Sequence, residues 1–320
     1  MDLKNLRKRV DNIDKKIIQL LNMRAKTTLD IAKLKRKSGK SIYSPDRERE
    51  VLKKLAVINR GPLTCGALEA IYREIMSCSL SLDRPLRIAY LGPEATFTHL
   101  AALKRFGSQV EYIATNSITD VFLEVERDNA DYGVVPIENS VEGAVSHTLD
   151  MFVDSELKIC SQTILDVAHH LLASCPKNKT RRIYSNPQVF GQCRIWLQEN
   201  LAGVEKIEVS STTRAAGIAA KEKYSACIAS LLAAKVYKLR VIASDIEDSP
   251  HNVTRFLIIG KTDVPPTGCD RTSIMFSIKD KVGALHDMLL PFKKYGINLT
   301  KIESRPSKKK AWEYYFFVDL

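Results

Sequence analysis

Apolar residues in the first segment repeat at helical spacing. They recur every three or four positions, at Leu6, Val10, Ile13, Ile17, Leu20 and Leu21. No proline or glycine interrupts this pattern before Gly39. The spacing predicts one long amphipathic helix from Leu3 to Lys37, followed by helices over 46–58 and 63–82. Because one helix cannot bury its own apolar stripe, we expect this helix to pack on other helices, including those of a second subunit.

After the junction Asp83-Arg84-Pro85, short apolar runs alternate with helical segments. Strands are predicted over 86–91, 111–114, 132–136, 158–161, 167–173, 182–184, 205–209, 226–229, 241–243 and 256–259. Helices are predicted over 98–106, 118–127, 145–151, 187–201, 212–223 and 230–237. This alternation is typical of parallel sheets with helical crossovers. The segment is long for one sheet, so we expect two lobes with a cleft between them.

A linker at 263–268 contains two prolines and a glycine, and it separates this region from the tail. The tail pattern predicts a strand over 271–278, a helix over 283–295, and strands over 298–304 and 312–320. The expected domains are therefore residues 1–83, 86–262 and 270–320.

Composition narrows the choice of partners. The 320 residues are 45% hydrophobic and carry a formal net charge of +12, which favours anionic partners. No aromatic and basic residues interleave as a nucleic-acid surface requires, so we expect small anions and no nucleic acid. No stretch is apolar enough to span a membrane, and the N-terminus lacks a signal-peptide pattern. The seven scattered cysteines predict a reducing, cytoplasmic location, and no residue spacing indicates a metal or a cofactor.

Basic residues on the first helix have a defined geometry. Arg24 and Lys35 lie 35 − 24 = 11 residues apart, about three turns, and therefore share a face. Arg7 is rotated by about 100° from Arg24, so it is better placed to serve a neighbouring chain's site than its own. The alternative is a solvated basic face that binds nothing.

A second candidate site begins at Thr254-Arg255-Phe256, where a loop meets the apolar run that ends at Gly260. Catalytic groups often lie where a loop joins a rigid strand, although a capped strand end with a surface arginine is the alternative. Polar stretches at 91–97, 136–143, 185–193 and 210–213 follow predicted strands or open predicted helices. Ligands of open α/β sheets bind at such positions.

The first segment resembles the all-helical chorismate mutase domain. The resemblance rests on Leu6-Arg7, Asp14, Arg24, Lys35, Tyr43-Ser44-Pro45-Asp46-Arg47-Glu48 and Arg73 to Ser79. It implies an intertwined homodimer that binds chorismate. By this resemblance Arg7 (from the partner subunit), Arg24, Arg47 and Ser79 bind carboxylates, Lys35 faces the ether oxygen, and Glu48 holds the ring hydroxyl. Ser44 and Asp83 depart from the pattern, standing where the family often has Asp and where it has Gln or Glu, respectively.

The middle segment resembles prephenate dehydratase, on the four polar stretches together with Thr254-Arg255-Phe256. The resemblance implies two α/β lobes like a type II solute-binding protein. It assigns to Thr254 the hydrogen bond that assists hydroxide departure from prephenate, and it makes Arg255 a substrate carboxylate anchor. Substrate contacts are also expected from Glu138, Asn139, Ser185, Gln192, Ser211 and Thr212. Together the two resemblances indicate a bifunctional family that makes phenylpyruvate for phenylalanine biosynthesis.

The tail resembles an ACT domain of the same family. The resemblance rests on Gly283-Ala284-Leu285-His286 and Glu303-Ser304-Arg305-Pro306, and it implies L-phenylalanine feedback through Gly283, Ala284, Leu285, Glu303, Ser304, Arg305 and Pro306. That module has the order βαββαβ, whereas the sequence stops after βαββ. We therefore expect a truncated or fragmentary module whose uncovered apolar face binds a partner or aggregates. A plain ferredoxin-like module is the alternative.

Two other functions fit parts of the sequence. A two-lobed sensor would bind a small acid without turning it over, so turnover distinguishes it from an enzyme. A basic helical module would bind nucleic acid with strong salt dependence.

Overall fold

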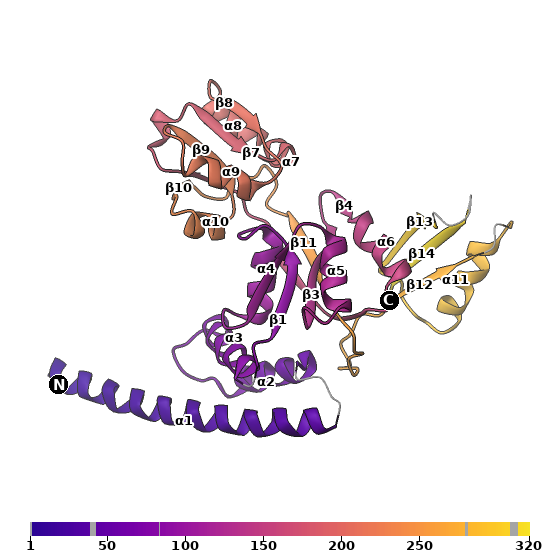
Figure 1. Cartoon of the computed structure of the whole chain (residues 1–320), viewed down its shortest axis with the longest axis horizontal. Helices are drawn as coiled ribbons and strands as arrows, with labels where there is room; N and C mark the ends of the chain where they lie inside the picture. Colours follow the sequence, from indigo (N-terminus) through magenta and orange to yellow (C-terminus); the bar gives the residue numbers. More distant parts are fainter. Residues whose placement is uncertain (1, 39–42, 83, 279–280, 308–312) are drawn as a thin grey trace.

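The computed structural model describes residues 2–38, 43–82, 84–278, 281–307 and 313–320. Figure 1 shows N-terminal helices, two α/β lobes and a small C-terminal sheet. We call residues 2–82 the helical domain, 84–166 with 253–264 the first lobe, 167–252 the second lobe, and 270–320 the C-terminal domain.

The helical domain contains α1 (Leu3–Lys37), α2 (Pro45–Ile58) and α3 (Cys65–Ser81). The predicted bounds of the first helix are confirmed. α3 begins where the Thr64 side chain accepts a hydrogen bond from the Ala67 amide. The N-terminal half of α1 extends away from the other helices (Figure 1), and its apolar residues Val10, Ile13 and Leu20 are more than half exposed.

The first lobe is built on a sheet with strand order β2-β1-β3-β11-β5, and β4 pairs with β3. Its strands are β1 (Arg87–Leu91), β2 (Glu111–Thr115), β3 (Tyr132–Asn139), β4 (Gly143–Ala144), β5 (Lys158–Asp166) and β11 (Val253–Gly260). Its helices are α4 (Phe97–Phe106), α5 (Ile118–Glu126) and α6 (Ser146–Asp154). Alternate residues of β11 enter two cores: Phe256 and Ile258 pack with Phe106 of α4, whereas Leu257 and Ile259 pack with α5.

The second lobe has strand order β10-β6-β9-β7-β8. Its strands are β6 (His170–Ala173), β7 (Arg182–Ser185), β8 (Glu205–Glu208), β9 (Ser225–Ala229) and β10 (Arg240–Ala243). Its helices are η1 (Lys177–Lys179), α7 (Pro187–Gln192), α8 (Arg194–Leu201), α9 (Thr212–Ala219) and α10 (Leu231–Val236). The single helix predicted over 187–201 is broken at Cys193, whose backbone leaves the helical region at φ −116° and ψ 20°.

Both sheets are mixed, which corrects the expectation of parallel sheets. β1 pairs in parallel with β2 and β3, and β7 with β8 and β9. By contrast, β11, through which the chain returns from the second lobe, is antiparallel to both β3 and β5. The two crossing segments are joined by the Val167 amide, which donates to the Asn252 carbonyl at 2.8 Å. Thr254, at the start of β11, therefore lies at the junction of the lobes.

The C-terminal domain contains β12 (Ser273–Ser277), α11 (Ala284–Lys294), β13 (Lys301–Pro306) and β14 (Tyr314–Asp319). The strands form an antiparallel sheet with β14 in the middle. Phe317 of β14 packs against the α5 side of the first-lobe core, so this sheet is docked on the first lobe.

Candidate active sites

The Thr254 hydroxyl is held by an asparagine from the neighbouring strand. Asn139 Nδ2 donates to Thr254 Oγ1 at 2.8 Å and to Asn252 Oδ1 at 2.8 Å. The orientation of the Asn139 amide is fixed because its oxygen accepts from the backbone amides of Val141 and Glu142. Since Asn139 donates to the Thr254 oxygen, the hydroxyl proton is left to donate elsewhere, and no acceptor for it occurs among the described residues.

The same network continues into the second lobe. Asn252 Nδ2 donates to Gln192 Oε1 at 3.1 Å, and Gln192 Nε2 donates to Glu142 at 3.2 Å. His169 Nε2 lies 2.7 Å from the same Gln192 oxygen and must donate to it, because that oxygen only accepts. Burial lowers the pKa of His169, which favours the neutral ring. A directed series of hydrogen bonds thus links Thr254 to both lobes and orients its hydroxyl.

Three other residues that were predicted to contact the substrate, Ser185, Ser211 and Thr212, have structural roles in the second lobe. The buried Ser185 hydroxyl donates to the Ile228 carbonyl at 3.0 Å. Ser211 caps α9 by accepting from the Arg214 amide at 3.1 Å, and Thr212 is the first residue of that helix. Of the predicted dehydratase side chains, Asn139, Gln192 and Thr254 are brought into one network.

Arg255 and Glu138, which were also predicted to contact the substrate, lie on the opposite face of the sheet from this network. Successive residues of a strand face opposite sides of the sheet, so Arg255 cannot share the face of Thr254. Its Nη2 lies 3.2 Å from Glu138 and 2.6 Å from Asp319 of the C-terminal domain. The guanidinium is therefore part of a domain interface.

Two pairs of predicted mutase residues are in contact. Arg24 Nη1 donates to Ser79 Oγ at 2.8 Å, and the Lys35 ammonium donates to Ser44. Lys35 and Ser44 also line a cavity of about 530 Å³ between the helical domain and the first lobe.

The remaining mutase residues are dispersed within one chain. Arg47 is exposed and pairs with Glu50, and Arg7 lies on the exposed N-terminal half of α1. Asp83 lies outside the described residues. One chain therefore does not gather the whole predicted set.

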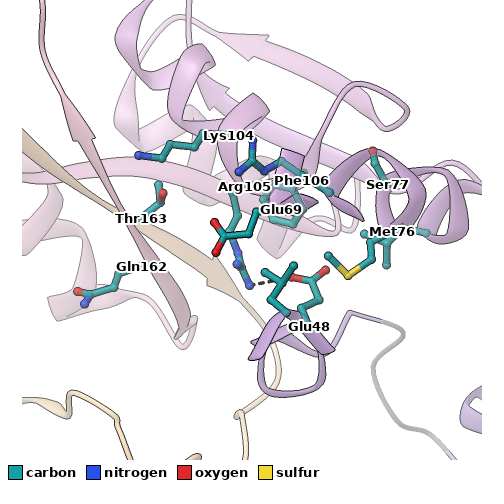
Figure 2. A pocket seen from close by; sticks show the side chains of 12 residues that line it. Glu48, Glu69, Met76, Ser77, Lys104, Arg105, Phe106, Gln162 and Thr163 are labelled. Carbon is teal, nitrogen blue, oxygen red and sulfur yellow. Dashed lines mark ion pairs between the residues drawn. The ribbon is translucent and has the colours of Figure 1, made fainter. Parts of the chain in front are cut away.

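Glu48 is paired with an arginine of the first lobe. Arg105 of α4 lies 3.0 Å from Glu48, and both face a cavity of about 180 Å³ between α2, α3, α4 and β5 (Figure 2). Burial raises the pKa of Glu48, although Arg105 opposes this shift. Arg105 also donates to the Tyr43 hydroxyl. The two domains thus share charged side chains next to the predicted mutase residues.

The predicted effector residues lie at the start of α11 and on β13. Gly283 precedes α11 with φ +81°, a left-handed conformation that favours glycine. Ala284 is buried and Leu285 is about one-third exposed. On β13, Ser304 and Pro306 are exposed and Glu303 is half-buried, whereas Arg305 pairs with Asp150 of α6 at 3.1 and 3.2 Å.

Sequence reasoning missed four residues of these sites: Asn252, Glu142, His169 and Arg105. Asn252 and Glu142 lie inside the motifs that were singled out, and their amide and carboxylate chemistry was a usable signal. His169 was considered only as a metal ligand. Nothing in the sequence marks Arg105 among 49 basic residues.

Across the described ranges, we find no group of three or more His, Cys, Asp or Glu side chains placed to hold a metal ion. In the same ranges, every helix is too short or too polar to cross a membrane.

Three family models match successive parts of the chain. Family models match chorismate mutase type II at residues 6–84, prephenate dehydratase at 88–264 and the ACT domain at 272–320. A bifunctional chorismate mutase/prephenate dehydratase of Aquifex aeolicus is 50% identical over 100% of this chain and 90% of its own length. Its counterpart in Pseudomonas aeruginosa is 46% identical over 99% and 89%.

A solved structure supports the fold of the lobes and the C-terminal domain. The prephenate dehydratase of Arthrobacter aurescens, in complex with L-Phe, is 32% identical and has a TM-score of 0.68. The match covers 73% of this chain and 80% of that chain. Because relatives of almost equal length match all three regions in order, the chain belongs to the family of bifunctional chorismate mutase/prephenate dehydratases.

Proposed function

We propose that the helical domain converts chorismate to prephenate, and that prephenate becomes phenylpyruvate at the junction of the two lobes. L-Phenylalanine acts as the effector through the C-terminal domain. The observation that carries the second reaction is the Thr254 hydroxyl, whose oxygen accepts from Asn139 so that its proton can be donated.

The mutase reaction needs no nucleophile because chorismate rearranges within one molecule. Catalysis comes from holding the reactive conformer and stabilising negative charge on the breaking ether oxygen. The Lys35 ammonium supplies the positive charge that stabilises this oxygen, and Arg24 and Ser79, which are hydrogen-bonded to each other, bind a carboxylate. Arg47 and Glu48 complete the site once a second chain is present.

The dehydratase reaction expels carbon dioxide and hydroxide, and aromatisation of the ring drives it. The electron pair of the breaking carbon–carboxylate bond enters the ring as the hydroxyl leaves, and a proton converts that hydroxyl to water. Thr254 donates a hydrogen bond to the departing oxygen. Asn139 and Gln192 keep the hydroxyl in place and contact the substrate.

The effector proposal rests on the C-terminal domain. We assign the phenylalanine contacts to the turn Gly283-Ala284-Leu285 and to β13 residues 303–306. The L-Phe complex of the Arthrobacter aurescens relative supports this choice of ligand. We also propose a reducing cytoplasmic location, which fits the seven free thiols.

We propose a homodimer, and the exposed apolar stripe of α1 supports it. Val10, Ile13 and Leu20 are 55%, 54% and 63% exposed, and a second copy of α1 would cover them. In that dimer Arg7 enters the partner's site.

Mixing two inactive variants tests this arrangement. Arg7→Ala and Arg24→Ala chains should each lose mutase activity, whereas mixed dimers regain one intact site. With random pairing, we expect recovery of about a quarter of wild-type turnover. Sedimentation should show dimers in every sample. If co-refolded variants stay inactive while forming dimers, Arg7 does not act across the interface.

The overall function is tested by adding chorismate to the purified protein. Chorismate loss and phenylpyruvate formation should both occur, and L-phenylalanine should slow the second. Binding of either acid without turnover would instead identify a sensor.

A further inference from the structure

Two adjacent residues of β11 serve two different domains. Thr254 faces the junction of the lobes, whereas Arg255 faces the C-terminal domain. Their partners on β3 are divided in the same way, because Thr254 is in register with Asn139 and Arg255 with Glu138. A displacement of the Arg255 side chain therefore acts on the backbone next to Thr254, the proposed hydrogen-bond donor.

The Arg255 guanidinium is held by carboxylates from both domains. Its Nη2 lies 2.6 Å from Asp319 Oδ2, and each of these side chains is only 9% exposed. The same nitrogen lies 3.2 Å from Glu138, whose other oxygen lies 3.3 Å from Lys301. Asp319 ends the central strand of the C-terminal sheet, and its second oxygen accepts from Ser273 at 2.6 Å.

Movement of the C-terminal domain must be transmitted to β11. If Asp319 moved away, the buried Arg255 guanidinium would keep only the longer ion pair with Glu138 at 3.2 Å, and this loss of charge compensation is unfavourable. Arg255 must therefore follow Asp319 when the C-terminal sheet shifts. Because β11 is paired with β3 on one side and β5 on the other, its displacement also reaches Asn139.

We propose that Arg255 is a positioning residue for the dehydratase step and that Asp319 of the C-terminal domain holds it there. The inference rests on the proposed function. In this proposal, the ion pair between Arg255 and Asp319 couples the position of the C-terminal domain to the position of the Thr254 hydroxyl. Neither side chain of the pair contacts the substrate.

Asp319→Asn tests the proposal by removing the charge and keeping the shape. Asp150→Asn is the matched control, because Asp150 makes a partly buried ion pair across the same boundary, with Arg305, but lies on α6 and not on β11 or β3. We expect Asp319→Asn to lower kcat for prephenate about tenfold or more, with KM within about twofold. Asp150→Asn should stay within about twofold of wild type in both constants. Mutase turnover serves as the internal reference and should not change.

Two further variants separate the loss of the ion pair from a loss of folding. Asp319→Glu restores the charge and should recover part of the lost kcat. If Asp319→Asn melts below the assay temperature, Lys301→Met replaces it. Lys301 holds Glu138, so its loss should also lower kcat and leave KM unchanged.

Three outcomes would overturn the proposal. Equal losses in Asp319→Asn and Asp150→Asn would mean that only domain docking matters. No loss in either would mean that Arg255 needs no partner. A raised KM with normal kcat would return Arg255 to substrate binding. A wild-type protein that does not consume prephenate would instead remove the proposed function itself, and this inference with it.

Discussion

Replacing Thr254 with alanine is expected to lower phenylpyruvate formation from prephenate by about 10²- to 10⁴-fold, the usual contribution of a positioned proton donor. The reason is geometric. Asn139 donates to the Thr254 oxygen, so the hydroxyl proton is available for donation to the leaving group of the proposed reaction. In the alanine variant Asn139 also loses that acceptor, while its bond to Asn252 remains.

The control for this prediction is Thr254→Ser, which keeps the hydroxyl and should retain turnover within about tenfold. Chorismate loss should be the same in all three proteins because the helical domain is untouched. Single-turnover kinetics with prephenate measure the effect directly. A near-normal rate in Thr254→Ala would exclude this residue from the chemistry.

The second large effect is expected at Lys35. Lys35→Ala should lower chorismate turnover by about 10²- to 10³-fold, as is typical when a charge-stabilising donor is removed. Its ammonium contacts Ser44 and faces the larger cavity beside the helical domain. In the proposed mechanism, the variant loses the positive charge that stabilises the breaking ether oxygen.

Lys33 provides the matched control on the same helix. Its side chain is 67% exposed and pairs with Asp30, so Lys33→Ala should leave turnover within about twofold. Both variants should consume prephenate normally and sediment like the wild-type protein. Equal mutase rates in Lys33→Ala and Lys35→Ala would remove Lys35 from the proposed site.

The pairing of Glu48 with Arg105 shows how the mutase and dehydratase regions are joined. The two side chains come from α2 and α4, and they meet in the smaller cavity (Figure 2). Glu48 was predicted from the motif around Pro45, but its partner was not. An ion pair between residues 57 positions apart, 105 − 48, depends on domain packing that no local pattern encodes.

The sequence by itself determined the elements and the chemistry of single positions. The unbroken three- and four-residue spacing of apolar residues predicted α1, because an apolar stripe of that period without proline or glycine is typical of an α-helix. The apolar run after Thr254 likewise fixed the strand that carries it. Strand alternation could also have shown that Thr254 and Arg255 face opposite sides.

Only the tertiary structure decided which groups meet on each face. Gln192 reaches Asn252 across 60 residues, and Asp319 reaches Arg255 across 64. The direction of β11 was also undecided, because a buried strand has the same apolar pattern whether its neighbours are parallel or antiparallel. Contacts at such separations arise from chain return and domain docking, which hydrophobic spacing along the chain does not specify.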